Sequence, residues 1–221
     1  MIGRTLTSVI EKRLNKGKAI VLLGPRQVGK TTLLQQCLEK KDYLLLDGDD
    51  LEVRSLLKEA GKSKLQAIIG KHKWVMIDEA QRIPEVGLIA KLIVDQFKDV
   101  QLLISGSSAL EINQSTQEPL TGRKYEYQLF PISWEEFEDH VGYLEASAQL
   151  EERLIYGMYP DVINHRHEAR EVLKQLTTSY LYQDVLSLSA IFLKCSPTSS
   201  IKQSIPSIAS CADSSPTNSG K

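Results

Sequence analysis

Short apolar runs alternate with amphipathic segments along the first 130 residues. Four mostly apolar runs and one alternating stretch predict β-strands over residues 19–23, 43–46, 74–77, 101–104 and 125–129. Apolar residues at helical spacing predict helices over residues 5–16, 30–40 and 86–97, and two short helices within residues 51–70. Strands that alternate with helices predict an α/β fold, a parallel sheet with helices on both faces. Ligands of such a sheet bind at the carboxyl ends of its strands.

The segment after the first predicted strand fits the phosphate-binding pattern G-x-x-x-x-G-K-[ST] at every fixed position. It reads Gly24-Pro25-Arg26-Gln27-Val28-Gly29-Lys30-Thr31, with Thr32 next. The glycines let backbone N–H groups turn toward phosphate oxygens, Lys30 offers a mobile charge to the outer phosphates, and Thr31 offers a hydroxyl to Mg²⁺. The helix that follows directs its positive end at the same anion. A strand before the loop and a helix after it favour a nucleotide site over a chance glycine-rich turn.

Two carboxylates, Asp78 and Glu79, end the third predicted strand. An acid at this place in a phosphoryl-transfer site helps to hold Mg²⁺, usually through water, and Asp78 is predicted to do so. Glu79 is predicted to be the general base that polarises the attacking water. Without the upstream loop, the pair would indicate only the start of a polar turn.

Two further candidates follow the fourth strand and precede the fifth. Ser105, or as a second choice Ser107, is placed to sense the γ-phosphate or orient the water, although a serine-rich turn explains the run equally well. Arg123 is a candidate arginine finger or phosphate sensor, because a guanidinium matches the charge of the transferring phosphoryl group. Position alone favours a surface arginine.

Two other acidic clusters are assigned to helix starts. The run Asp47-Gly48-Asp49-Asp50 reaches the carboxyl edge of the predicted sheet, but capping of the helix from Leu51 is favoured over a Mg²⁺ or ribose contact. Ser133-Trp134-Glu135-Glu136 fits a capping box, so its acids are interpreted as structural.

The composition suits a folded domain and gives no overall electrostatic signal. The chain is 42% hydrophobic and 25% charged, with a formal net charge of −1, so nucleic acid as a partner is not supported by net charge, although a local basic patch stays open. Cys37, Cys195 and Cys211 show no metal or disulfide spacing. The amino terminus lacks a signal-peptide pattern, and no apolar run approaches the ~18 residues that span a bilayer. These features predict a cytoplasmic protein without a membrane partner.

Together the motifs resemble prokaryotic AAA-related ATPases of the type-14 AAA domain family. The matching pieces are 24–32, Ile77-Asp78-Glu79-Ala80-Gln81, Ser105-Gly106-Ser107, Leu120-Thr121-Gly122-Arg123, 130–137, Gly157-Met158-Tyr159-Pro160 and 180–186. The resemblance covers residues 1 to about 190 and implies a P-loop NTPase (AAA-like) core with ATP and Mg²⁺ as cofactors. It implies that Lys30 and Thr31 bind phosphate and Mg²⁺, that Asp78 binds Mg²⁺ and that Glu79 activates water. It also strengthens the prediction that Arg123 is a functional arginine.

The predicted organisation is a core over residues 1–140, a helical segment over 141–190 and a tail over 191–221. From Cys195 to Lys221, nine of 27 residues are Ser and three are Pro, and no periodicity persists. Such a segment cannot bury enough apolar surface to fold alone, which predicts a disordered tail. Family members usually continue with a further domain here, so the alternative hypothesis is a frameshift after about residue 190. Translation of the gene in the other two frames tests it.

Three functions are compatible with these residues. The first is a Mg²⁺-dependent ATPase whose turnover drives conformational change in an unknown protein partner or in the further domain that family members carry. A homo-oligomer is also compatible with the sequence. The alternative is a nucleotide-gated binding module with little or no turnover. A small-molecule kinase ranks last, because it needs no water-activating acid beside the Mg²⁺ acid and the sequence offers no arginine-rich lid.

Overall fold

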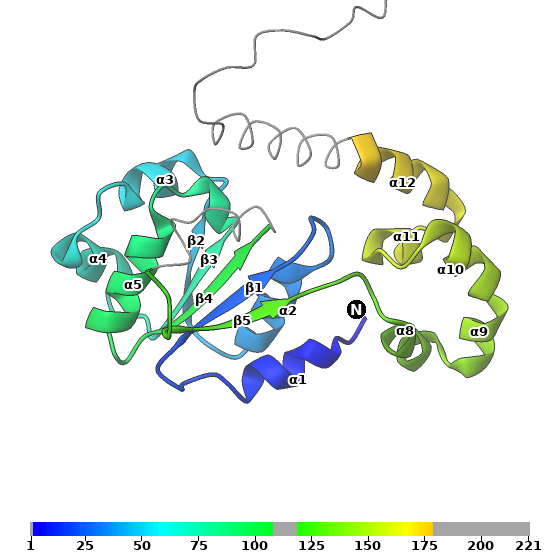
Figure 1. Cartoon of the computed structure of the whole chain (residues 1–221), viewed down its shortest axis with the longest axis horizontal. Coiled ribbons are helices and arrows are strands. Elements are labelled where there is room, and N and C mark those ends of the chain that lie inside the picture. The colour runs from blue at the N-terminus through cyan, green and yellow to red at the C-terminus, as the bar shows by residue number, and fades with distance from the viewer. Residues whose placement is uncertain (1, 108–118, 179–221) are drawn as a thin grey trace, which may run out of the picture.

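A five-stranded parallel sheet forms the centre of the computed structural model, which describes residues 2–107 and 119–178 (Figure 1). The strand order is β2-β3-β4-β1-β5. The strands are β1 (Ala19–Leu23), β2 (Tyr43–Asp47), β3 (Trp74–Asp78), β4 (Gln101–Gly106) and β5 (Lys124–Gln128). The parallel pairings confirm the predicted fold class. Predictions for residues 108–118 and 179–221, including the motif 180–186 and the tail, lie outside the described residues.

Burial on both faces explains the apolar runs. Every residue of β1 is buried, because β4 and β5 flank it and helices cover both faces of the sheet. The register pairs Leu22 with Ser105 on β4, and it pairs Ile77 on β3 with Ile104 on β4. The strand β4 runs two residues further than predicted, so Ser105 lies within it rather than after it.

Two helical layers pack against the sheet. One contains α1 (Thr5–Glu11) and α2 (Lys30–Leu38), and the other contains α3 (Leu51–Leu57), α4 (Lys62–Ile69) and α5 (Val86–Gln96). Each fully buried leucine or isoleucine in these layers contributes about 1.5–3 kcal/mol. The α1 helix ends five residues earlier than predicted, and the chain then turns through Asn15 and Gly17, both at positive φ. As predicted, Asp50 caps α3 by accepting a hydrogen bond from the Glu52 N–H.

A separate group of helices follows the sheet and lies beside the carboxyl ends of the strands (Figure 1). These are α8 (Trp134–Val141), α9 (Tyr143–Ala148), α10 (Leu150–Tyr156), α11 (Pro160–Asn164) and α12 (Ala169–Leu176). The predicted capping box opens α8, with Ser133 and Glu136 bonded reciprocally. Phe137 of α8 and Ala146 of α9 belong to one apolar cluster, which packs these two helices together.

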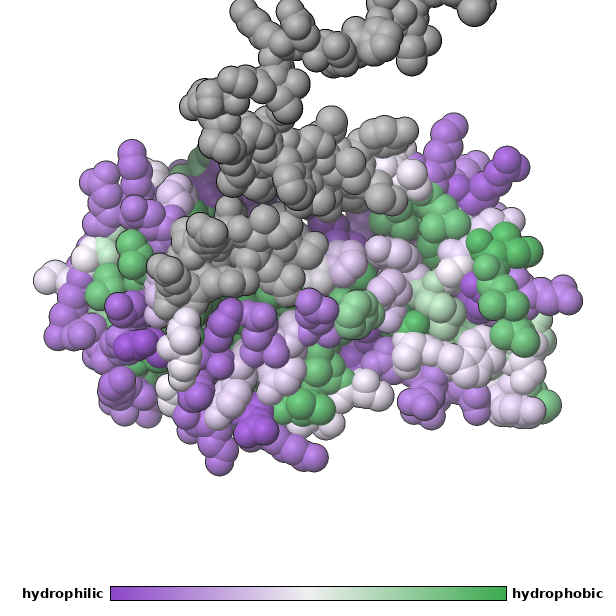
Figure 2. All heavy atoms as spheres, viewed as in Figure 1, coloured by the Kyte–Doolittle hydropathy of each residue, from purple (hydrophilic) through white to green (hydrophobic). Residues whose placement is uncertain are grey.

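The outer side of α9 and α10 exposes apolar side chains. Leu144 is 82% exposed, Leu154 78% and Ile155 72%, and apolar surface is visible over these helices in Figure 2. Within the described residues, none of the helices combines the length and apolarity that crossing a membrane requires.

Candidate functional site

The loop between β1 and α2 is shaped by close backbone contacts. A Cβ atom at Gly24 would clash with the Leu129 carbonyl oxygen, because the Leu129 N–H donates to the Leu23 carbonyl at 2.7 Å and draws the end of β5 against the loop. Gln27 (φ 60) and Gly29 (φ 92) then adopt left-handed conformations, and Gly29 caps α2. Such turns point successive N–H groups toward one side, which suits a bound anion.

Lys30 lies inside this loop. Its side chain is 5% exposed, and its Nζ donates to the Gly24 carbonyl at 3.0 Å and the Pro25 carbonyl at 2.7 Å. A buried ammonium at the first residue of α2 adds its charge to the positive end of the helix. The loop therefore collects positive charge on its concave side.

Three elements converge on the carboxylate of Asp78. Thr31 on α2 donates from Oγ1 to Asp78 Oδ2 at 2.8 Å, and Ser105 on β4 donates from Oγ to Oδ1. The strand β4 lies directly beside β3, so the side chain of Ser105 on β4 reaches the carboxylate of Asp78 on β3. Hydroxyl and carboxylate oxygens are the donors that Mg²⁺ prefers. The described residues contain no group of three or more His, Cys, Asp or Glu that could hold a metal ion.

Ser105 lies beside Asp78 rather than free at the end of its strand. It is fully buried, and its hydroxyl is bonded to Asp78. This hydrogen bond can orient the carboxylate of Asp78, and a contact of Ser105 with the γ-phosphate or the attacking water stays a prediction. Ser107 is also buried and contacts Gln81 through its backbone N–H, which donates to Gln81 Oε1 at 3.1 Å.

Glu79 turns away from β3 in a left-handed conformation, with φ 44 and ψ 44. A non-glycine residue held there stores about 1–3 kcal/mol of strain. Its Oε2 accepts a hydrogen bond from Gln81 Nε2, and Gln81 in turn accepts from Ser107 at the end of β4. Gln81 was not predicted as a site residue. Its position two residues after Glu79 could have indicated that the two side chains lie within reach of each other.

Two neighbouring pockets adjoin the loop. The first, about 330 Å³, is lined by the loop and the start of α2, by Glu79, and by Pro160, Asp161 and Asn164 of α11. The second, about 250 Å³, shares Gly29, Thr32, Pro160 and Asn164 with the first. Its lining mixes the apolar side chains of Ile2, Val28, Leu33, Ile132 and Pro160 with the polar ones of Arg4, Thr32, Gln36, His140 and Asn164. A polar pocket beside a more apolar one can accommodate phosphates and a planar base.

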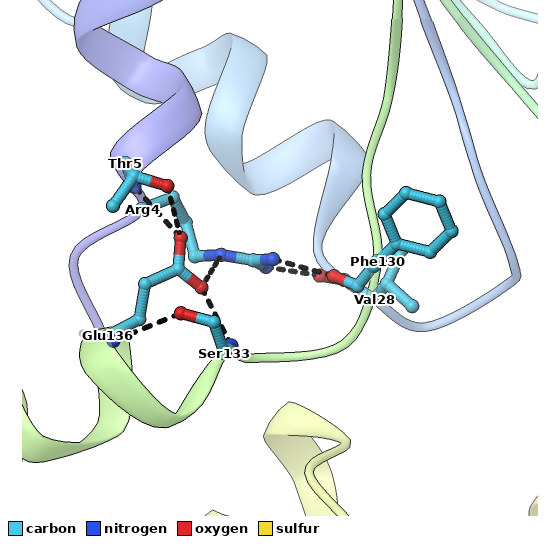
Figure 3. A network of polar contacts seen from close by, with 6 residues as sticks. All are labelled: Arg4, Thr5, Val28, Phe130, Ser133 and Glu136. Carbon is cyan, nitrogen blue, oxygen red and sulfur yellow. Dashed lines mark hydrogen bonds and ion pairs between the residues drawn. The ribbon is translucent and has the colours of Figure 1, made fainter.

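A buried polar cluster joins the amino-terminal segment to the loop and to α8 (Figure 3). Arg4 Nε pairs with Glu136 Oε2 at 3.0 Å, and the same guanidinium donates to the Val28 carbonyl at 2.9 Å and the Phe130 carbonyl at 2.6 Å. Glu136 also accepts from the Thr5 N–H at 2.8 Å. Burial alone would raise the pKa of Glu136, but the N–H donors of Ser133 and Thr5 and the charge of Arg4 outweigh it and hold the pKa below its ordinary value.

Arg123 lies at the opposite edge of the sheet from the loop. The register pairs Ala19 with Lys124, and the Ala19 N–H donates to the Arg123 carbonyl at 2.9 Å. The loop begins after Leu23, four residues or about 13 Å further along β1. The Arg123 guanidinium pairs instead with Asp95 at 2.8 Å. The prediction that Arg123 senses phosphate within its own chain is therefore wrong, and a role as a finger for a second copy stays a prediction.

Comparisons with solved structures yield distant likenesses. A Signal Transduction ATPase with Numerous Domains protein with a tetratricopeptide repeat sensor, from Pyrococcus horikoshii, aligns with a TM-score of 0.47 and 13% identity, over 72% of this chain and 28% of that one. A structure of Pif1 helicases on forked double-stranded DNA aligns with a TM-score of 0.41 and 16% identity, over 61% of this chain and 45% of that one.

Sequence comparisons identify the family. Uncharacterized proteins of Mycobacterium bovis and Mycobacterium tuberculosis are each 28% identical over 121 residues, which are 54% of this chain and 26% of the relative. The match thus spans about a quarter of the length of these relatives. The sequence model of the AAA domain family AAA_14 matches residues 16–138. That match covers more than half of the chain, which therefore belongs to this family and contains an AAA-type P-loop ATPase domain.

Proposed function

We propose that the chain binds ATP with Mg²⁺ and hydrolyses it, and that turnover changes the conformation of an attached domain or of an associated protein. The observation that carries this proposal is the hydrogen bond of 2.8 Å between Thr31 and Asp78, beside the buried Lys30. It joins the helix that follows the loop to the end of β3, where Glu79 lines the same pocket as Lys30.

The proposed roles follow from the donors present. Lys30 exchanges its loop carbonyls for oxygens of the outer phosphates, and Thr31 and Asp78 hold Mg²⁺, which neutralises phosphate charge when bound. Glu79 accepts a proton from water while that water's oxygen bonds to the γ-phosphorus. The bond from the γ-phosphorus to the bridging oxygen breaks, and ADP and phosphate leave. Gln81 orients the carboxylate of Glu79 through the hydrogen bond between them.

The alternative is a nucleotide-gated module that binds ATP and turns it over slowly. The location of Arg123 favours it, because the arginine predicted to stabilise transition-state charge lies at the far edge of the sheet. An arginine supplied by a second copy or a partner would then be needed for fast turnover.

The variant Glu79→Gln separates the two functions. For an ATPase we expect ATP affinity to change by less than about threefold while turnover falls about 10²–10⁴-fold, because the amide cannot accept the proton. The measurement is steady-state phosphate release beside calorimetric ATP binding. Glu85→Gln is the matched control, since Glu85 is exposed six residues further along the chain. Equal turnover in all three proteins would contradict the role of Glu79.

The variant Ser105→Ala tests the positioning of Asp78. We expect the Mg²⁺ concentration for half-maximal turnover to rise about 10–100-fold, the usual effect of removing a hydrogen bond that orients a metal ligand. Ser107→Ala is the control, because Ser107 contacts Gln81 through a backbone N–H that alanine retains. The same Mg²⁺ dependence in both variants would exclude this function of Ser105.

A further inference from the structure

Because all five strands are parallel, the segments that lead into them meet at one edge of the sheet. This edge lies opposite the loop 24–29 between β1 and α2, which we call the ATP loop after its proposed ligand. These segments are residues 12–18, 39–42, 70–73, 97–100 and 119–123, and we call this region the amino edge. Its members are far apart in the sequence, so their combined charge becomes apparent only in the fold.

The amino edge is strongly basic. Its segments contain ten Lys and Arg residues and three acidic ones, whereas the whole chain has a formal net charge of −1. The basic residues are Lys12, Arg13, Lys16, Lys18, Lys40, Lys41, Lys71, Lys73, Lys98 and Arg123. At the carboxyl edge the acidic residues Asp47, Asp49, Asp50, Asp78 and Glu79 outnumber the basic ones, which are Arg26, Lys30 and Arg82. The near-neutral total therefore conceals two edges of opposite charge.

Several of these cations are available to a ligand. Lys71, Lys73 and Lys98 are exposed, and none of them forms an ion pair within residues 2–107 and 119–178. Two hollows of about 340 and 450 Å³ meet here and share Lys73, Lys98 and Asp99. Two further cations of the amino edge, Arg13 and Lys18, lie over the ring of Tyr125 at 5.0 and 5.2 Å from its centre.

We infer that the amino edge binds the phosphate backbone of a nucleic acid. Spaced lysines along adjoining hollows match a chain of phosphates, which a polyanion presents at regular intervals. An anionic membrane fits less well, because a surface that inserts into lipid carries apolar side chains beside its cations. The large exposed apolar side chains of the described residues lie elsewhere, above all on α9 and α10. Hydrophilic residues dominate the corresponding lower left of Figure 2.

The test uses the full chain and a fluorescein-labelled 20-nucleotide oligo(dT), with anisotropy read at 50, 100 and 200 mM salt. We expect a Kd on the order of micromolar at 50 mM salt that rises steeply with salt. The triple variant Lys71→Ala, Lys73→Ala, Lys98→Ala should raise Kd at least about tenfold and lower the slope of log Kd against log salt by about 2. Lys58→Ala, Arg170→Ala, Lys174→Ala removes the same charge from exposed residues outside the amino edge and should change Kd less than about twofold.

Three results would overturn the inference. They are no binding of oligo(dT) by the unmodified chain at 50 mM salt, equal weakening by the two triple variants, and tighter binding to phosphatidylserine vesicles than to oligo(dT). Circular dichroism and ATP binding confirm that the first triple variant is folded, since its residues lie at the edge opposite the ATP loop. The inference is independent of the proposed turnover, because oligo(dT) binding is measured without ATP.

Discussion

Replacing Lys30 by alanine is expected to weaken ATP binding at least about 100-fold and to remove measurable turnover. The ammonium is buried at the start of α2, where it would contact the outer phosphates, and loss of one partner of a buried charge pair costs about 2–5 kcal/mol. Calorimetry with MgATP measures the affinity, and phosphate release measures turnover.

The same substitution leaves the carbonyls of Gly24 and Pro25 without the donor they now share, so stability must be measured beside affinity. Lys64→Ala is the matched control, because Lys64 also donates to a backbone carbonyl, that of Lys58, but on an exposed surface. If Lys30→Ala is folded and binds ATP as tightly as the Lys64 variant, the phosphate role of Lys30 is excluded.

The second large effect is expected on stability. Arg4→Ala should lower the free energy of unfolding by about 3–5 kcal/mol, because it leaves the buried carboxylate of Glu136 without its cation and two carbonyls without a donor. Urea titration measures the change. Arg166→Ala is the control, since Arg166 pairs with Glu145 and Glu152 at an exposed site and should cost less than about 1 kcal/mol. Equal losses would show that the Arg4 pair contributes no more than a surface pair.

The pH dependence of stability gives a second measurement of this pair. The folded-state pKa of Glu136 is lower than its ordinary value of 4.5, so its contribution is complete above that value. It is lost as the pH falls through the folded pKa. The stability difference between the unmodified chain and Glu136→Gln should therefore be constant from pH 6 to 8 and shrink below about pH 4.5. A difference that grows at acid pH would contradict this assignment.

The sequence predicted those parts of the fold whose signal is local. The strand Ala19–Leu23 has the predicted bounds because a strand buried on both faces must be apolar throughout. The loop 24–29 was recognisable because its glycines, Lys30 and Thr31 are adjacent in sequence. Asp78 and Glu79 were found for the same reason, with a strand immediately before them.

The sequence was less informative where strand order, register or long-range packing determines the surroundings of a residue. Ser105 was predicted to contact the γ-phosphate or the water, and its hydrogen bond to Asp78 was not foreseen, because the sequence does not show that β4 lies directly beside β3. Arg123 directly precedes a parallel strand, which places it at the edge of the sheet away from the loop. This position could have been inferred from the sequence, because the strand was predicted to begin at residue 125. The ion pair of Arg4 with Glu136 and the place of α11 in the pocket lining both bring together residues more than 100 positions apart. No local sequence pattern reveals such neighbours.

The cluster around Arg4 also makes the ATP loop and α8 thermodynamically linked. One guanidinium holds both Glu136 at the first turn of α8 and the carbonyl of Val28 in the loop, so α8 cannot move without disturbing a loop contact. Linkage is reciprocal: if a body bound to α8–α12 changes ATP affinity by some factor, ATP changes the affinity for that body by the same factor.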